Sequence, residues 1–130
     1  GYFSDAPGSQ SYPVPWLKYL YGDRANFIAV VGRWQELAVV RTFKRGFRHG
    51  TQLPIRSLTF PPVIPGVGAS DHASYWKLGH EAIMLTDTAY QRNPHYHTAG
   101  DRPETLDYPR MAEVINGVFE AALAIANGSP

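Results

Sequence analysis

The stretch Asn26-Phe27-Ile28-Ala29-Val30-Val31-Gly32 decides the fold class of this 130-residue chain. After Asn26 it is a continuous run of apolar, largely β-branched residues closed by a glycine. Such a run is typical of a strand buried on both faces of a parallel or mixed sheet. Residues 34–48 then change to helical period, with apolar side chains at Leu37, Val40, Phe43 and Phe47. A buried strand followed by an amphipathic helix indicates an α/β fold.

The sequence on either side of this unit predicts further alternating strands and helices. We expect strands at 53–60 and 82–85, and helices at 16–21, from Ser70 or Asp71 to Leu78, and at 108–126. Asp107 is placed to cap the last helix, whose first turn tolerates Pro109. The predicted buried stripe of that helix is Met111, Val114, Ile115, Val118, Ala122 and Ile125. These strands are too few for a complete doubly wound fold.

Composition and charge exclude several classes of function. The chain has no cysteine, which excludes disulfides, thiolate zinc sites and cysteine nucleophiles. Its formal charge of +1 provides no strong electrostatic case for nucleic acid or for an anionic membrane, so we expect neither as a partner. The basic residues between Arg41 and Arg48 are expected to form a solvated helix face. No apolar run approaches the roughly 20 residues that span a bilayer.

Two loops contain the residues with candidate chemistry. Open α/β sheets place their sites in loops at the carboxyl ends of strands, and loops 66–72 and 93–98 both follow predicted strands. The first loop continues a Pro- and Gly-rich segment, 63–68, and ends in Asp71-His72, which is also consistent with a helix-capping carboxylate and its neighbour. The spacing of His95 and His97 fits either a metal pair or two loop histidines bonded to backbone carbonyls. Residue spacing leaves both alternatives open.

The two loops together carry a more specific pattern. Ser70-Asp71-His72-Ala73-Ser74-Tyr75-Trp76 precedes Gly79 and a short strand, and Asn93-Pro94-His95-Tyr96-His97-Thr98 precedes Asp101 and a helix start at Leu106-Asp107-Tyr108. In order and spacing this resembles the C-terminal half of co-catalytic two-zinc aminopeptidases, a zinc exopeptidase family that includes glutaminyl cyclases. The resemblance covers essentially the whole chain. It implies that residues 1–130 are the C-terminal portion of a three-layer α/β/α zinc-peptidase domain whose N-terminal half is missing.

The resemblance also implies roles for individual residues. His97 matches the family's last zinc ligand, and Tyr96 matches a tyrosine that donates a hydrogen bond to the developing oxyanion in part of the family. Asp71 matches a buried carboxylate near the metals, and His72 and Asp101 are expected to support the metal ligands as well. Tyr90 and Arg92 match positions that line the substrate pocket. The cofactor implied for the complete enzyme is a pair of zinc ions, and the substrate is a peptide.

The sequence departs from the family pattern in one important respect. A complete site of this family needs four further metal ligands and a glutamate as general base. No His-x-Asp pair followed by a Glu-Glu pair occurs among the 130 residues. One imidazole cannot hold zinc at useful affinity, because protein zinc sites need three or four ligands. We therefore expect this chain alone to be inactive and to retain no zinc.

Three interpretations follow. The first is the C-terminal part of a zinc aminopeptidase, with the N-terminal half of the same domain as its partner. The second is a non-catalytic binding domain derived from that family, which associates with itself through the sheet edge left open by the missing strands. The third is an enzyme that uses His72, His95 and His97 in a new site.

Overall fold

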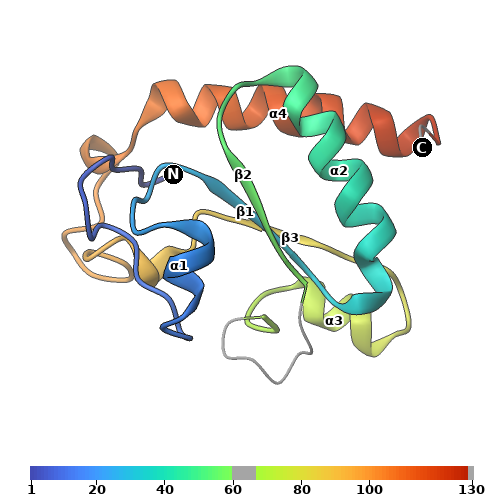
Figure 1. Cartoon of the computed structure of the whole chain (residues 1–130), viewed down its shortest axis with the longest axis horizontal. Helices are drawn as coiled ribbons and strands as arrows, with labels where there is room; N and C mark the ends of the chain where they lie inside the picture. The colour runs from blue at the N-terminus through green and yellow to red at the C-terminus, as the bar shows by residue number, and fades with distance from the viewer. Residues whose placement is uncertain (60–66, 129–130) are drawn as a thin grey trace.

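The computed structural model describes residues 1–59 and 67–128 of the chain (Figure 1). The helices are α1 (Leu17–Tyr21), α2 (Leu37–Gly50), α3 (His72–Lys77) and α4 (Tyr108–Ala126), with 3-10 turns at Trp34–Glu36, Ala89–Gln91 and Pro103–Thr105. The strands are β1 (Ile28–Gly32), β2 (Ile55–Thr59) and β3 (Met84–Thr86). Helices and strands alternate as the sequence predicts, and the α/β class is confirmed.

The sheet is mixed and has the order β2-β1-β3. β1 pairs in parallel with β2, aligning Ile28 with Ile55, and antiparallel with β3, aligning Val31 with Met84. All five residues of β1 are buried, which confirms the prediction of a strand covered on both faces. Among the described strands, β2 and β3 each have one edge without a strand partner.

One face of the sheet is covered by α2 and α4, which lie against each other (Figure 1). Ile28 and Val30 pack there against Val40 and Phe47 of α2. α2 and α4 approach closely because glycines face the partner helix. A Cβ on Gly46 would lie 2.6 Å from the Cα of Ala121, well inside van der Waals contact.

The opposite face of the sheet is covered in part, by α1 and α3. Leu17 of α1 is buried, and Trp76 of α3 packs with Val67 against Val31. The candidate site lies on this face, in a hollow lined by strand residues such as Val31, Leu58 and Met84 and by loop residues outside both helices.

The prediction for α4 is confirmed in its length and its cap but is wrong for part of its buried stripe. Asp107 accepts a hydrogen bond from the backbone N–H of Arg110 at 3.0 Å, as an N-cap does. However, Ile115, Ala122 and Ile125 are exposed, with Ile115 at 67%. The helix turns Gly117 and Ala121 inward instead, because only small residues fit at its close crossing with α2.

The start of α3 lies where the sequence predicts, but it lacks the predicted side-chain cap. Ser70 and Asp71 precede α3 as expected, but Asp71 has helical backbone angles and its side chain makes no capping hydrogen bond. The predicted loop 63–68 lies outside the described residues except for Val67 and Gly68.

A buried ion pair joins the end of β1 to the start of α2. Glu36 is 0% exposed and accepts hydrogen bonds from the backbone N–H of Arg33, at 2.8 Å, and from its guanidinium. Burial raises the pKa of Glu36, but the hydrogen bonds from Arg33 outweigh it and keep the pKa below the usual value. The Arg33 guanidinium also lies 4.8 Å from the ring centre of Trp76, so the pair connects α3 to the sheet.

None of the helices in the described part of the chain is long and apolar enough to cross a membrane.

Candidate functional site

The antiparallel orientation of β3 determines where the two candidate loops lie relative to each other. β3 runs antiparallel to β1 and β2, so the loop that follows β2 and the loop that follows β3 leave opposite ends of the sheet. They face each other across a hollow of about 280 Å³ on the sheet face that carries α1 and α3. Val67 and Ser70 line it from one side and Tyr90 and Tyr96 from the other. The candidate site therefore lies on a sheet face, not at a shared carboxyl edge.

The backbone that leaves β3 is strained. Thr88 and Ala89 have φ angles of 67° and 47°, in the left-handed region that is rarely adopted by residues other than glycine. The Asp87 carboxylate stabilises this turn, since its oxygens accept from the N–H of Ala89 at 3.1 Å and of Tyr2 at 2.9 Å. Strain of this kind concentrates at functional sites. The turn places Tyr90 at the hollow.

Arg92 has a different position from the one expected of a pocket residue. It is 5% exposed, and its guanidinium donates to Gln10 Oε1 and Thr88 Oγ1, both at 3.0 Å, and to the Phe27 carbonyl at 2.8 Å. Burial lowers the pKa of Arg92 to about 10, so the group remains charged at neutral pH. Arg92 is absent from the lining of the hollow. Its side chain braces the strained turn from inside the protein.

Sequence reasoning missed this internal network of Asp87, Thr88 and Gln10. Asp87 carried a usable signal, because an aspartate directly after a strand commonly accepts from the N–H two residues on. Gln10 carried none: its contact with Arg92 joins residues 82 apart in the chain.

His97 is presented at the tip of a tight turn. The His95 carbonyl accepts from the backbone N–H of Thr98 at 2.9 Å and from its hydroxyl at 2.7 Å, and His97 itself has φ 58°. The imidazole of His97 is exposed and stacks on the ring of Tyr96, with 3.9 Å between ring centres. Within the described part of the chain it makes no hydrogen bond. An exposed imidazole held in one orientation is suited to bind a ligand from outside.

Asn93 fixes the base of this turn. It is buried, its side-chain oxygen accepts from the N–H of His95 at 2.9 Å, and its amide donates to Asp101 at 3.1 Å. Asp101 is exposed, and its backbone N–H also donates to the carbonyl of Thr98, the residue after His97, at 3.1 Å. It thus positions the loop that carries the histidine.

The remaining candidate residues do not form a metal site by themselves. His72 is buried, donates from Nε2 to the Val67 carbonyl at 2.6 Å and meets the ring of Trp76 edge-on at 4.4 Å. Asp71 is exposed in the described structure, whereas the resemblance implies a buried carboxylate. In residues 1–59 and 67–128, no three His, Asp or Glu side chains are grouped to hold a metal ion.

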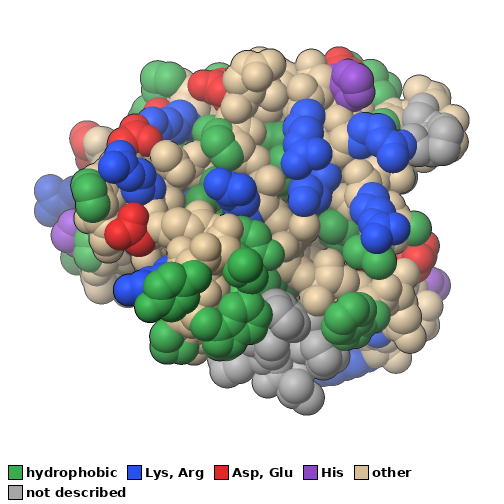
Figure 2. Space-filling view, viewed as in Figure 1, with side chains coloured by type: hydrophobic (Ala, Val, Ile, Leu, Met, Phe, Trp, Pro, Cys, Tyr) green, Lys and Arg blue, Asp and Glu red, His purple; other side chains and the backbone are tan. Residues whose placement is uncertain are grey.

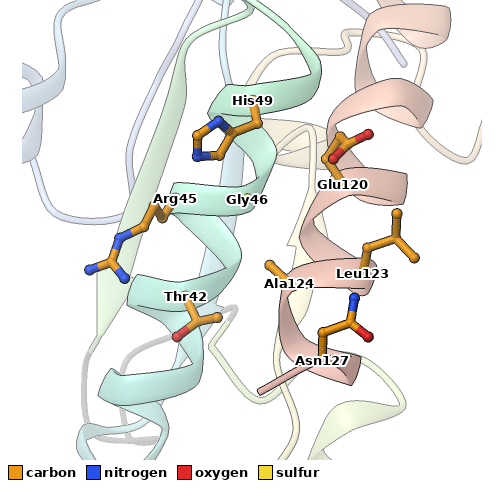
Figure 3. A pocket seen from close by; sticks show the side chains of 8 residues that line it. All are labelled: Thr42, Arg45, Gly46, His49, Glu120, Leu123, Ala124 and Asn127. Atoms are coloured by element: carbon orange, nitrogen blue, oxygen red, sulfur yellow. The ribbon is translucent and has the colours of Figure 1, made fainter. Parts of the chain in front are cut away.

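A second hollow, of about 310 Å³, lies between α2 and α4 on the other face of the sheet (Figure 3). Gly46 contributes no side chain to it. Thr42 and His49 of α2 and Glu120 and Asn127 of α4 are among its lining residues, while the side chain of Arg45 extends away from α4. The sheet separates this groove from Tyr96 and His97, so the two hollows are independent.

Comparison with known proteins relates part of the chain to peptidases. The chain is 48% identical over 119 residues to "Uncharacterized protein YfbL" of Escherichia coli, which covers 92% of this chain but 37% of that protein. It is 45% identical over 49 residues to a "Probable leucine aminopeptidase" of Arthroderma benhamiae, covering 37% of this chain and 13% of that protein. A protein with the same printed name from Arthroderma otae is 28% identical over 95 residues, 70% of this chain and 26% of that protein.

Each of these similarities covers only a minor part of the related protein. The chain spans little more than a third of the length of YfbL and less of the fungal proteins. No family model and no solved structure matches the chain. The chain thus contains a region similar to probable leucine aminopeptidases.

Proposed function

We propose that this chain is the C-terminal part of a zinc-dependent aminopeptidase, which hydrolyses N-terminal peptide bonds, and that it is inactive alone. The observation that carries the proposal is the stack of Tyr96 on His97 at the rim of the 280 Å³ hollow. The similarity of part of the chain to probable leucine aminopeptidases supports the reaction class. We call "complete protein" this chain together with the additional residues that the proposal requires.

In this proposal His97 is one ligand of a zinc site. A neutral imidazole that is exposed and free of hydrogen bonds can bind the metal without first losing a protein contact. The residues described here do not fit a zinc site without further ligands, since zinc requires three or four. The other ligands and the general base would come from the rest of the complete protein.

Tyr96 would act on the substrate carbonyl. Its ring lines the hollow, 6.1 Å from the ring centre of Tyr90, and is stacked on His97. A phenolic O–H held at the rim can donate a hydrogen bond to the oxyanion that develops as the peptide carbonyl is attacked. Because that charge develops in the transition state, the bond accelerates the reaction more than it strengthens substrate binding.

We therefore expect Tyr96→Phe in the complete protein to lower kcat about 100-fold while KM stays nearly constant. The matched control is Tyr108→Phe, which removes an exposed phenolic hydroxyl at the start of α4. Steady-state hydrolysis of a leucine arylamide measures both constants. An unchanged kcat for Tyr96→Phe would remove the tyrosine from the proposed chemistry.

We further propose that the N-terminal half of the complete protein covers the open edge of β3 and the neighbouring surface of α4. Unpaired N–H and C=O groups on β3 can accept another strand. Beside them an open hollow of about 380 Å³ is lined by Leu85, Met111, Val114 and Ile115. Phe119 adds to the exposed apolar surface of α4. The same features favour the second candidate, a non-catalytic domain that pairs with itself through this edge.

Mixing experiments separate these functions. Zinc content and leucine arylamide hydrolysis would be measured for this chain alone and for the chain combined with the residues that precede it in the complete protein. Zinc binding and turnover in the combined sample alone support the aminopeptidase proposal. A stable, inactive oligomer of the chain that is unchanged by those residues supports the self-pairing domain. Turnover by the chain alone contradicts both.

A further inference from the structure

A basic surface lies where α2 adjoins β2. α2 contains no Asp or Glu, and Arg41, Arg45 and Arg48 on it are exposed, with Lys44 half-buried between them and Arg56 exposed on β2. Figure 2 shows Lys and Arg side chains gathered over these two elements. Within residues 1–59 and 67–128, none of the five forms an ion pair.

The positive charges of this surface lie close enough to act on one another. Lys44 donates from Nζ to Ser57 Oγ at 2.8 Å, which fixes its ammonium beside β2. Burial, together with the charges of Arg48 and Arg56, lowers the pKa of Lys44. Glu120 of α4 lines the same groove as Arg45, and no ion pair joins the two among the described residues. The surface is therefore largely uncompensated and suited to an anionic partner.

An apolar cluster adjoins this basic surface on the same side of the molecule. Trp16, Tyr19 and Leu20 are spaced as neighbours on one helical face at α1, and they are 49%, 82% and 63% exposed. Figure 2 shows hydrophobic side chains gathered over α1, next to the Lys and Arg side chains. The buried Leu17 holds α1 against the sheet, beneath the exposed cluster.

Ser57 on β2 connects the apolar cluster to the basic surface. Its carbonyl accepts a hydrogen bond from the hydroxyl of Tyr21 on α1 at 2.8 Å, and its Oγ accepts the bond from Lys44 on α2. Burial raises the pKa of the Tyr21 phenol, and the positive charge of Arg56, the residue before Ser57, opposes that rise. α1 and α2 are thus bound to one residue of one strand, which holds the two groups on a common face.

We propose that this face, formed by the basic side chains of α2 and β2 with Trp16, Tyr19 and Leu20, binds the surface of an anionic lipid bilayer. Lys and Arg near such a surface are attracted to its headgroups. Exposed Trp, Tyr and Leu insert at the boundary between headgroups and acyl chains. The net charge of only +1 does not reveal this basic surface, because acidic residues on other elements balance its charges in the total.

The apolar cluster at α1 and the basic surface of α2 and β2 lie side by side on different elements, which favours a bilayer over single-stranded nucleic acid as the partner. Nucleic acid would require aromatic rings within the basic groove, so that bases stack while phosphates are neutralised. Here the aromatic side chains belong to α1, which carries the single basic residue Lys18, 5.5 Å from the ring centre of Tyr19, and the other basic side chains belong to α2 and β2. An interface that is apolar at one end and cationic at the other matches the layered chemistry of a membrane surface.

Co-sedimentation with vesicles tests the proposal. We expect the protein to bind vesicles of phosphatidylcholine containing a quarter of phosphatidylserine, to bind pure phosphatidylcholine far more weakly, and to dissociate as salt is raised. Equal binding to both kinds of vesicle, or binding to neither, would overturn the proposal. Vesicle binding does not depend on zinc or on turnover. The membrane proposal can therefore fail while the proposed aminopeptidase function stands, and the proposed function can fail while the membrane proposal stands.

Two double variants separate the basic and the apolar contributions. Arg48→Ser with Arg56→Ser should weaken binding about 30-fold, whereas Lys77→Ser with Arg102→Ser removes two charges elsewhere and should change it less than about 3-fold. Tyr19→Ser with Leu20→Ser should weaken vesicle binding about 10-fold or more. If this apolar variant binds as before, or if a single-stranded oligonucleotide displaces the protein from vesicles, the surface is a general polyanion site and the membrane proposal is wrong.

Discussion

In the complete protein, His97→Ala is expected to remove one zinc equivalent and to leave no more than about 1% of the turnover. The reason is that the exposed imidazole, stacked on Tyr96, is the group in this chain that the proposal assigns to the metal. Zinc content by mass spectrometry of the metal and leucine arylamide hydrolysis measure the two effects. An unchanged zinc content would refute the assignment of His97 as a ligand.

Two further variants make this experiment specific to the imidazole. His97 has a left-handed backbone, φ 58°, which asparagine tolerates better than alanine does. His97→Asn should therefore keep the turn and still lose the zinc. His95→Ala removes the neighbouring exposed imidazole and should keep both zinc and turnover. If His95→Ala loses the metal as well, the two histidines act together, as their spacing permits.

Gly46→Val is expected to destabilise the fold by about 3 kcal/mol. A Cβ at this position meets the Cα of Ala121 at 2.6 Å and the carbonyl of Glu120 at 3.0 Å, which are backbone atoms that cannot rotate away. α2 and α4 must separate to accept the side chain. The change is expected to lower stability even though glycine is a poor helix former and its replacement by another residue favours the isolated helix.

Urea unfolding followed by tryptophan fluorescence measures the effect of Gly46→Val. The control is Gly68→Ala, because a Cβ on Gly68 meets no atom of residues 1–59 or 67–128 within 4 Å, and the stability of this variant should change by less than about 0.5 kcal/mol. Gly46→Ala should lie between the two. Equal stabilities for Gly46→Val and the parent protein would show that the two helices do not pack as closely as the structure has them.

Part of the local structure at the candidate site follows from short-range features of the sequence. The turn that carries Tyr96 and His97, and the helix start at Asp107, depend on hydrogen bonds between residues two to four apart, so local residue types specify them. The direction of the Arg92 side chain is not specified locally. Its neighbour Tyr90 reaches the hollow, while Arg92 turns inward to the Phe27 carbonyl, 65 residues away in the chain.

By itself, the sequence determined the buried strand at 28–32, the helix from Tyr108 to Ala126 and the residues that resemble an exopeptidase loop. Each of these depends on a pattern that neighbouring residues carry, such as an unbroken apolar run or a capping carboxylate. The tertiary structure alone decided the antiparallel direction of β3, the outward turn of Ile115 and the common face of α1 and α2. These features follow from contacts between distant residues, such as Gly46 with Ala121, and no local pattern records which partner a side chain will meet.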